Sequence, residues 1–286
     1  MSASAAPISR ASREAAAPFA WGERTYVMGI VNASPDSFSG DGMATCAAAV
    51  ERAAHQLAEG SDIVDVGGQS TRPGHVAVDA SEERRRLLPV VRGLCERFPD
   101  AFVSVDTFDA GVFRDAHAAG ARMLNSIWGL DDDALLAAAV ECGVPVAIMH
   151  NRRSTVYDGD VVDEVLRYLG AQGARAVAAG IARERVLLDP GIGFGKTAEQ
   201  NLAVLAALPR LRALGFPTLL GTSRKSTLGK LTGREPSERA FATAATVALA
   251  VAAGIDVVRV HDVAAMRDVL KVSDAIVRGV RPPDWQ

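Results

Sequence analysis

The polar side chains of this sequence that could take part in chemistry are concentrated at the carboxyl-terminal ends of short apolar runs. Eight such runs are predicted to form β-strands, over residues 25–32, 62–68, 102–107, 122–126, 145–150, 185–191, 217–223 and 256–262. Nearly all end in a reactive or ligand-binding type: Asn32, Asp106, Asn125, His150, Asp189, Ser223 with Arg224 and Lys225, and Arg259 with His261. A single polar residue at such a position is more often a turn former or a helix cap. A set this consistent predicts one shared functional site.

The elements that must position these residues alternate regularly along the chain. Between the predicted strands lie amphipathic stretches such as 44–60 and 132–143, each ending in a glycine suited to a helix terminus. The strands are almost continuously apolar, which is typical of a parallel sheet covered on both faces. Eight successive β–α units predict an α/β fold, a single (β/α)8 TIM barrel with its active site at the C-terminal ends of the strands. A doubly wound open sheet is the alternative, although it more often has fewer units.

Composition excludes several classes of protein. The formal net charge of −3 argues against a general nucleic-acid binder, and no apolar run is long enough to span a membrane. The three cysteines, Cys46, Cys95 and Cys142, lie in predicted helices without metal-ligand spacing, which favours a reducing, cytoplasmic setting. Residues 1–22 are predicted to form a flexible N-terminal arm, and 23–286 a single domain. A transit peptide is the alternative for the first 20 residues, which are rich in Ala, Ser and Arg.

The stretch LLDPGIGFGKT, residues 187–197, raises the question of a phosphate-binding loop. A P-loop requires a glycine six residues before its lysine, and that position holds Pro190, which has no N–H to donate. The three glycines also lack the spacing of a dinucleotide-binding turn. The loop must therefore hold something other than a nucleotide phosphate.

Two further loops carry polar residues. Residues 28–42 leave the first strand at Asn32 and continue in Ser, Asp, Gly and Pro around Phe38, a composition suited to a mobile cover over a substrate. Residues 65–74 contain two adjacent glycines, hydroxyl side chains and Arg72, whose forked donors suit phosphate or carboxylate. Taken alone, either segment could be an ordinary surface loop.

Six motifs give the sequence a specific resemblance to a known family. VNASPDSFSGDG (31–42), DIVDVGGQSTRPG (62–74), SVDTFDAGV (104–112), LLDPGIGFGKT, LLGTSRKSTLGKL (219–231) and VVRVHDV (257–263) resemble, in order, the signatures of the dihydropteroate synthases. The resemblance covers about residues 25 to 280. It implies a dimeric TIM barrel that condenses (7,8-dihydropterin-6-yl)methyl diphosphate with p-aminobenzoate, releasing pyrophosphate with the help of Mg²⁺. Sulfonamides are expected to compete with p-aminobenzoate.

The resemblance also implies roles for individual residues. Asp189 would accept two hydrogen bonds from the guanidine-like edge of the pterin, and Asp106, Asn125 and Lys225 would meet its other heteroatoms. Phe194 and Met149 would wall the pterin pocket. Lys196 receives no role from the family and is expected to be exposed to solvent.

The remaining roles concern the diphosphate, the metal and p-aminobenzoate. Asn32 would bind Mg²⁺ through its amide oxygen, and the diphosphate side would be formed by Asn32, Thr71, Arg72, Arg259 and His261. Phe38, Pro73 and Ser226 would contact p-aminobenzoate. The residues expected to act in catalysis are Asn32, Arg72, Asp106, Lys225, Arg259 and His261.

The sequence departs from the family pattern at three positions, which hold Ser34, Gln69 and Ser126 where Thr, Glu and Asp are usual. The change at Ser126 is expected to matter most, since it removes an acid beside the pterin site. Two other hypotheses compete with a synthase. A related barrel that transfers a methyl group from methyltetrahydrofolate to a corrinoid protein would not need the STRPG, SRKS and RVHD segments. A non-catalytic paralogue would be expected to lack residues of the site.

Overall fold

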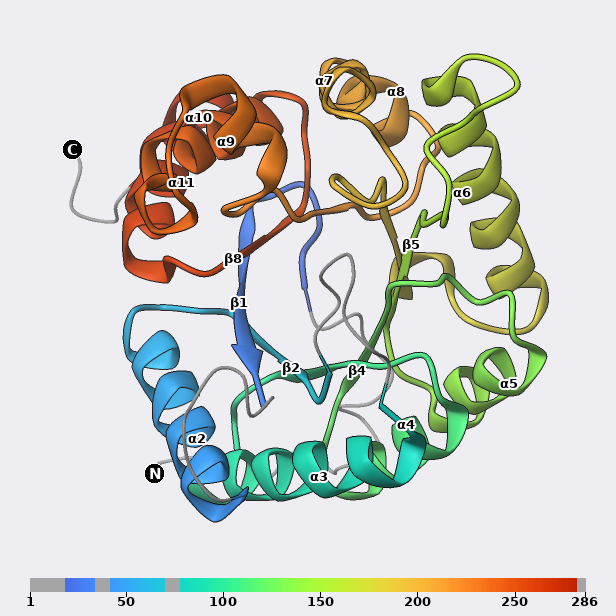
Figure 1. The fold of residues 1–286 in the computed structure, drawn as a ribbon, viewed down its shortest axis with the longest axis vertical. Coiled ribbons are helices and arrows are strands. Elements are labelled where there is room, and N and C mark those ends of the chain that lie inside the picture. The colour runs from blue at the N-terminus through green and yellow to red at the C-terminus, as the bar shows by residue number, and fades with distance from the viewer. Residues whose placement is uncertain (1–18, 34–41, 70–77, 282–286) are drawn as a thin grey trace, which may run out of the picture.

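The computed structural model describes residues 19–33, 42–69 and 78–281, with side chains from residue 46 onward in the second range. Its eight strands are β1 (Tyr26–Asn32), β2 (Ile63–Gly67), β3 (Val103–Asp106), β4 (Met123–Ser126), β5 (Val146–Met149), β6 (Val186–Asp189), β7 (Leu219–Leu220) and β8 (Val257–Val260). Each lies within a range predicted from sequence. Figure 1 looks down the barrel, with helices ringing the strands.

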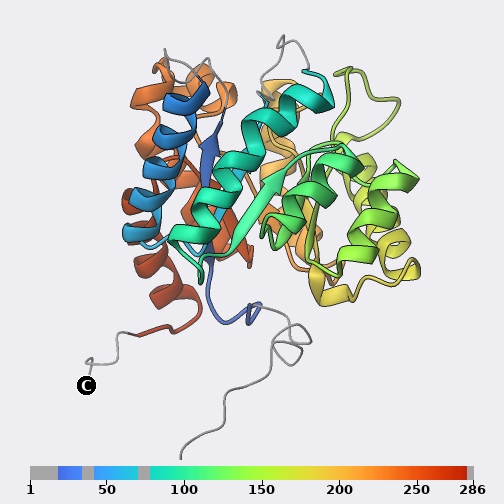
Figure 2. The same cartoon turned by 90° about the horizontal axis from the view of Figure 1, so that it is seen from below.

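The helices follow the strands in regular alternation. They are α2 (Gly42–Ala58), α3 (Ala80–Arg97), α4 (Ala110–Ala118), α5 (Asp133–Cys142), α6 (Val161–Ala178), α7 (Ala198–Ala206), α8 (Leu208–Arg212), α9 (Ser226–Thr232), α10 (Ala240–Ala252) and α11 (Val263–Val277). Short 3₁₀ turns occupy Arg183–Arg185 and Pro236–Glu238. Figure 2, at a right angle to Figure 1, shows α2 to α5 lying outside the strands.

All strand pairs are parallel, in the order β6-β5-β4-β3-β2-β1-β8-β7. The two ends of this sheet meet at a bridge between Leu188 and Thr218, where the Leu188 N–H donates to the Pro217 carbonyl at 2.9 Å. This contact closes the barrel. The (β/α)8 prediction is therefore confirmed.

The sequence starts several helices at a side chain that accepts from the first turn. Such caps satisfy N–H groups that have no partner within the helix. They are Asp79, Asp109, Asp132, Asp160 and Thr197. The predicted glycine terminus of α5 is present at Gly143, which adopts the left-handed conformation. These local signals fix where each crossover turns back towards the barrel.

Apolar side chains fill two layers, one between strands and helices and one inside the barrel. The inner layer includes Met28, Ile63, Met123, Leu187 and Leu219. These residues occupy the N-terminal half of the lumen, so the polar side chains of the strands are left to the C-terminal half. Stability and chemistry are thus divided between the two ends, as is usual in this fold.

The N-terminal opening of the barrel is closed by aromatic residues. The ring of Phe19 lies 4.8–5.0 Å from the rings of Trp21, Tyr26 and Phe102, and the Trp21 indole donates to the Glu184 carbonyl at 2.7 Å. The final residues of the predicted N-terminal arm, 19–22, therefore pack against the barrel. The cysteines all lie on helices, as predicted, and are free.

Candidate active site

The C-terminal half of the lumen holds a connected group of buried ionisable side chains. Three carboxylates, Asp65, Asp106 and Asp189, face three cations that stand at strand ends or in the loops that follow. The cations are Lys196, Lys225 and Arg259. Burying charge is costly unless opposite charges and hydrogen bonds compensate it, so a cluster of this kind indicates a functional site.

Asp65 lies at the centre of this group, and the sequence reasoning missed it. Its carboxylate is fully buried and accepts from Arg259 Nε at 2.7 Å, from Asn125 Nδ2 at 3.0 Å and from Ser104 Oγ at 2.7 Å. One signal in the sequence could have revealed it: Asp65 is an acidic residue in the middle of an otherwise apolar strand. It lies two residues before Gly67, so both face the same side of β2. Asp65 orients Arg259 and Asn125 for whatever binds above them.

Arg259 bridges Asp65 to Asp106. Its Nη2 donates to Asp106 Oδ2 at 3.2 Å, and its guanidinium is one-fifth exposed. Burial raises the pKa of Asp106 above its usual value, although the charge of Arg259 opposes that shift. The bonds of Arg259 lie on the side assigned to the pterin, and its predicted role towards the diphosphate remains a prediction.

Asp189 ends β6 and begins the loop that the sequence analysis singled out. Burial raises its pKa to about 6, although a hydrogen bond from the Gly191 N–H at 2.8 Å favours the ionised form. Gly191 has a φ of +68°, and a Cβ there would lie 2.0 Å from the His150 carbonyl oxygen. Only glycine fits, so the loop can turn tightly beside the carboxylate.

Lys225 and Phe194 meet at the rim of the lumen, on the loops that follow the neighbouring strands β7 and β6. The Lys225 ammonium lies 3.9 Å from the centre of the Phe194 ring, a cation–π contact. Burial and the charge of Arg259 lower the pKa of Lys225 to about 8. Met149 ends β5 and is 4% exposed, close beneath Gly191. The structure thus brings together all six residues assigned to the pterin: Asp106, Asn125, Met149, Asp189, Phe194 and Lys225.

His261 follows β8, the strand next to β7 in the barrel. Burial, reinforced by Arg259, lowers its pKa to about 3, so the imidazole is neutral. Ser223 Oγ accepts from the His261 backbone N–H at 3.1 Å and lies 3.0 Å from His261 Nδ1. In the tautomer in which the Ser223 hydroxyl donates to Nδ1, the ring proton lies on Nε2. His261 can donate a hydrogen bond to an anion, but it carries no charge.

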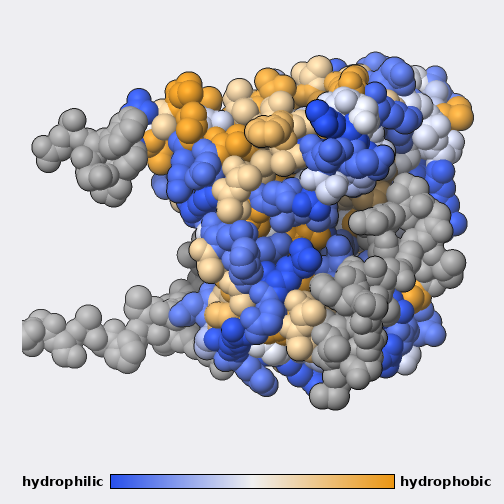
Figure 3. Space-filling view, turned by 60° about the vertical axis from the view of Figure 1, so that its left-hand side comes forward, coloured by the Kyte–Doolittle hydropathy of each residue, from blue (hydrophilic) through white to orange (hydrophobic). Residues whose placement is uncertain are grey.

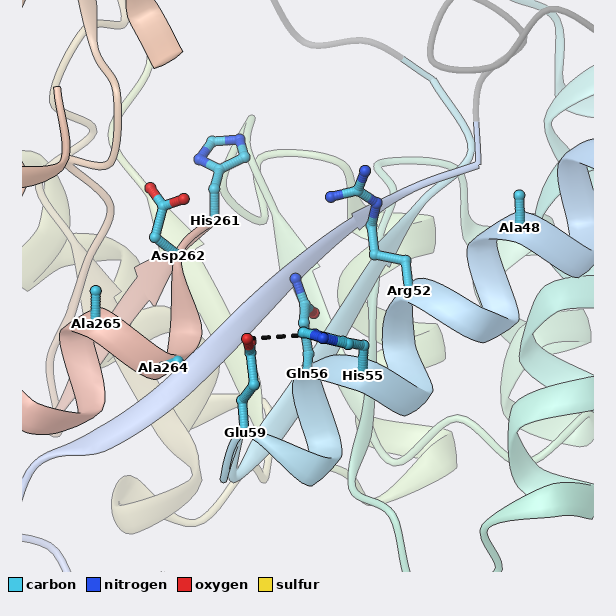
Figure 4. Close-up of a pocket in the computed structure, with 9 residues that line it drawn as sticks. All are labelled: Ala48, Arg52, His55, Gln56, Glu59, His261, Asp262, Ala264 and Ala265. Atoms are coloured by element: carbon cyan, nitrogen blue, oxygen red, sulfur yellow. Dashed lines mark ion pairs between the residues drawn. The ribbon is translucent and has the colours of Figure 1, made fainter. Parts of the chain in front are cut away.

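A pocket of about 490 Å³ adjoins His261, between α2 and the start of α11. Figure 4 shows His261 and Arg52 at one end of this pocket and the ion pair of His55 with Glu59 at the other. The pocket lies beside the barrel rather than over the pterin residues. Polar side chains of α2, among them Arg52 and Glu59, line the pocket next to His261.

The prediction that Lys196 is exposed was wrong. The residue is 7% exposed, and its ammonium contacts His150 Nδ1 at 2.9 Å and the carbonyl oxygens of Gly191 and Phe194, each at 3.0 Å. The positive φ of Gly195 turns the chain inward, so the side chain passes beneath the loop. A lysine after three glycines gave no sequence signal for this direction.

Two of the three departures have a structural explanation. Gln69 is buried and donates to Glu83 Oε2 at 3.4 Å, where a glutamate would place a second acid against Glu83. Ser126 is fully buried and donates to the Gly129 carbonyl at 2.6 Å. It alternates with Asn125 and therefore lies on the helix side of β4, away from the lumen. The expectation that this change removes an acid beside the pterin is not supported by its position.

Other predicted residues lie at the edge of the described site or outside it. Asn32 ends β1, and Ser226 is the exposed first residue of α9. The predicted residues Ser34, Phe38, Thr71, Arg72 and Pro73 fall outside the described ranges. Over residues 19–33, 42–69 and 78–281, no cluster of three or more His, Cys, Asp or Glu side chains could hold a metal, and no helix could cross a membrane.

Comparisons with known proteins agree with this geometry. A family model described as pterin binding enzyme matches residues 28–261. A dihydropteroate synthase of Synechocystis is 44% identical over 91% of this chain and 93% of its own. A Clostridium difficile dihydropteroate synthase solved with pteroic acid has a TM-score of 0.88 at 42% identity, covering 91% of this chain and 99% of its own. The Yersinia pestis enzyme solved with a sulfonamide drug has a TM-score of 0.84 at 38% identity, covering 91% and 96%.

Proposed function

Because this chain belongs to the dihydropteroate synthase family of pterin-binding enzymes, we propose how its residues divide the work of that reaction. The chain is a transferase of folate biosynthesis. It joins (7,8-dihydropterin-6-yl)methyl diphosphate to p-aminobenzoate, giving 7,8-dihydropteroate and pyrophosphate. The observation that carries the proposal is the buried charged group in the C-terminal half of the barrel, which offers acceptors and donors to a flat polar ring.

The pterin lies across the lumen in this proposal. Asp189 accepts from the ring's amino group and the adjacent N–H, while Lys225 donates to ring oxygen and nitrogen. Asp106, whose pKa is raised by burial, and Asn125, hydrogen-bonded to Asp65, meet the remaining heteroatoms. Phe194 and Met149 cover the faces of the ring. Asp106, Asn125, Met149 and Asp189 stand on strands of the barrel, whereas Phe194 and Lys225 stand on the loops that follow β6 and β7.

The departing diphosphate is assigned to the side of Asn32 and His261. Neutral His261 donates through Nε2, and Arg72 with Thr71 would complete the anion site from the loop after β2. Loss of pyrophosphate leaves positive charge on the exocyclic carbon, which electron donation from the dihydropterin ring stabilises. Donors that strengthen their bonds as the anion departs lower the barrier.

We propose Mg²⁺ as the metal, delivered with the diphosphate. Mg²⁺ commonly keeps several waters and binds through one or two protein oxygens and substrate phosphates. That habit fits a site in which Asn32, at the end of β1, supplies one amide oxygen and the diphosphate supplies others. The ion would neutralise charge on the leaving group.

The amine enters from the side of the loops. Ser226 stands at the exposed start of α9, beside Lys225, where a hydroxyl can meet the carboxylate of p-aminobenzoate. Phe38 and Pro73 are assigned to its ring from the two loops. The neutral arylamine forms the C–N bond as the C–O bond to pyrophosphate is lost, and its nitrogen then gives up a proton to the departing pyrophosphate or to water, so the step requires no general base from the chain. Sulfonamides, which resemble p-aminobenzoate, are proposed to compete at this position, as the Yersinia pestis complex suggests.

A second copy of the chain is proposed to cover the outer face of α10 and α11. That face exposes Phe241 by 91%, Ile276 by 77%, Leu249 by 67% and Val272 by 61%. Figure 3 shows apolar residues gathered on the upper part of the molecule, where these helices lie. Large apolar side chains left in water on adjoining helices are typical of an association surface.

The free cysteines support a cytoplasmic setting for the protein.

Chromatographic detection of dihydropteroate tests the proposed reaction. The native chain, incubated with both substrates and Mg²⁺, is expected to form a product that sulfamethoxazole suppresses and excess p-aminobenzoate restores. Failure of the amine to restore the product would contradict a shared position for drug and substrate. Absence of product from the native chain would contradict the synthase itself.

A further inference from the structure

Lys196 is a buried cation that none of the roles above uses. Its three ammonium hydrogens find three acceptors, namely His150 Nδ1 and the carbonyl oxygens of Gly191 and Phe194, at 2.9–3.0 Å. No carboxylate within the described part of the chain forms an ion pair with it. Burial lowers the pKa of Lys196 to about 7, although the charge of Asp189 opposes that shift. Desolvating an ammonium is costly, and the direct partners of Lys196 are neutral acceptors, so its buried position calls for an explanation.

The partner of Lys196 is itself held rigidly. His150 follows β5, its backbone N–H donates to the Asp189 carbonyl at 3.0 Å, and its ring packs against Tyr157 and Tyr168. Burial and the charge of Lys196 lower the pKa of His150 to about 3. The imidazole therefore stays neutral and can accept through Nδ1. His150 is therefore a rigidly held acceptor that fixes the position of the Lys196 ammonium.

Both carbonyl partners of Lys196 belong to the loop that covers the pterin position. Gly191 is the residue whose N–H donates to the Asp189 carboxylate, and its carbonyl also accepts from the Phe194 N–H at 3.2 Å. Phe194 presents its ring to Lys225. Tyr157 adds a hydrogen bond to the Gly195 carbonyl at 2.9 Å. The loop is thus tied to the barrel at both sides of Phe194, with Lys196 beneath it.

We propose that Lys196 is a positioning residue for the pterin site. Its ammonium, hydrogen-bonded to His150, holds the β6–α7 loop in the conformation in which Phe194 covers the pterin and Asp189 faces it. The inference rests on the proposed function, since it assigns a further residue to the pterin side of the same site. A loop that is already ordered in the empty protein loses less conformational entropy when the pterin binds, so the binding free energy is more favourable. Lys196 acts through Phe194 and Asp189 and touches no reacting atom.

The test measures binding of 6-hydroxymethylpterin and, separately, the KM values of both substrates. Lys196→Met removes all three donors at similar length, and Lys196→Gln keeps two donors without charge. Lys230→Met, at an exposed position on α9, is the matched control. Lys196→Met is expected to weaken pterin binding about 10-fold and to raise the dihydropterin KM similarly, with the p-aminobenzoate KM changed less than about 2-fold. Lys196→Gln should lie between the native chain and Lys196→Met.

A double-mutant cycle separates positioning from general stability. If Lys196 acts through Phe194, adding Phe194→Leu to Lys196→Met should cost little beyond the larger single loss. Additive losses, an equal rise of both KM values, or native pterin affinity in Lys196→Met and Lys196→Gln would each overturn the inference. Pterin binding is measured without turnover. A native chain that binds pterin but forms no dihydropteroate would therefore contradict the proposed function and leave this test intact.

Discussion

Replacing Asp189 with asparagine should separate ligand binding from stability. The carboxylate is 5% exposed, and its pKa rises from 3.8 to about 6 in the fold. Asparagine has a similar shape and can still accept the Gly191 N–H through its amide oxygen. Its amide nitrogen, however, would face the N–H donors of the pterin in place of a second acceptor. Losing a charged pair of hydrogen bonds should cost about 3 kcal/mol, or about 100-fold in affinity.

The same substitution should stabilise the empty protein. A carboxyl whose pKa is raised in the folded chain ionises more easily when unfolded, so its ionised form opposes folding above pH 3.8 and fully so above pH 6. The shift corresponds to about 3 kcal/mol at neutral pH. Asp189→Asn should therefore increase the free energy of unfolding at pH 7 by up to about this amount, and this gain should disappear below pH 4.

Calorimetric titration with 6-hydroxymethylpterin and urea unfolding at pH 7 and pH 3.5 test both halves. Asp158→Asn, an exposed substitution in the loop after β5, is the control and should change neither quantity. Native pterin affinity in Asp189→Asn would refute the assignment of Asp189. Weaker binding together with a large loss of stability at pH 7 would refute the electrostatic argument, because the binding loss would then report damage to the fold.

Three further variants have distinct expected outcomes. Asp65→Asn removes the fully buried charge that holds Arg259, and it should lower the free energy of unfolding in urea by about 3–5 kcal/mol. An unchanged unfolding midpoint would show that Asp106 alone compensates the charge of Arg259. Ser126→Asp should leave the dihydropterin KM within about 2-fold of native while lowering the melting temperature, since the serine is buried on the helix side of β4. A large change in that KM would place residue 126 at the ring. Phe241→Asp combined with Ile276→Asp should convert a dimer to a monomer by light scattering, and a native dimer mass in the double variant would exclude the α10–α11 face.

The barrel and most of the pterin site could be predicted from the sequence because both depend on local patterns. Each strand reads as an apolar run, and the residues that follow it converge because parallel strands end at one face. Asp106, Asn125, Asp189 and Lys225 were found in this way. Asp106, Asn125 and Asp189 are buried and Lys225 is half-buried at the same end of the barrel, whereas their roles remain predictions.

The residues that the sequence analysis misjudged depend on contacts between distant segments. Asp65 lies within a strand, and its importance comes from Arg259, 194 positions away. Lys196 was expected in water, but positive-φ glycines turn it beneath the loop towards His150. Ser126 was assigned to the wrong face because it adjoins Asn125, although neighbours on a strand point to opposite sides. The sequence showed the residue types, but it did not show in which direction the side chains of Lys196 and Ser126 point or which distant residue pairs with Asp65.

Pyrophosphate release from the dihydropterin diphosphate, measured with Mg²⁺ in the presence and absence of p-aminobenzoate, tests the central claim most directly. The site described above predicts release that depends on the amine and is matched by an equal amount of dihydropteroate. Binding of the pterin with no release at any amine concentration would contradict it and identify the chain as a pterin-binding protein without catalysis.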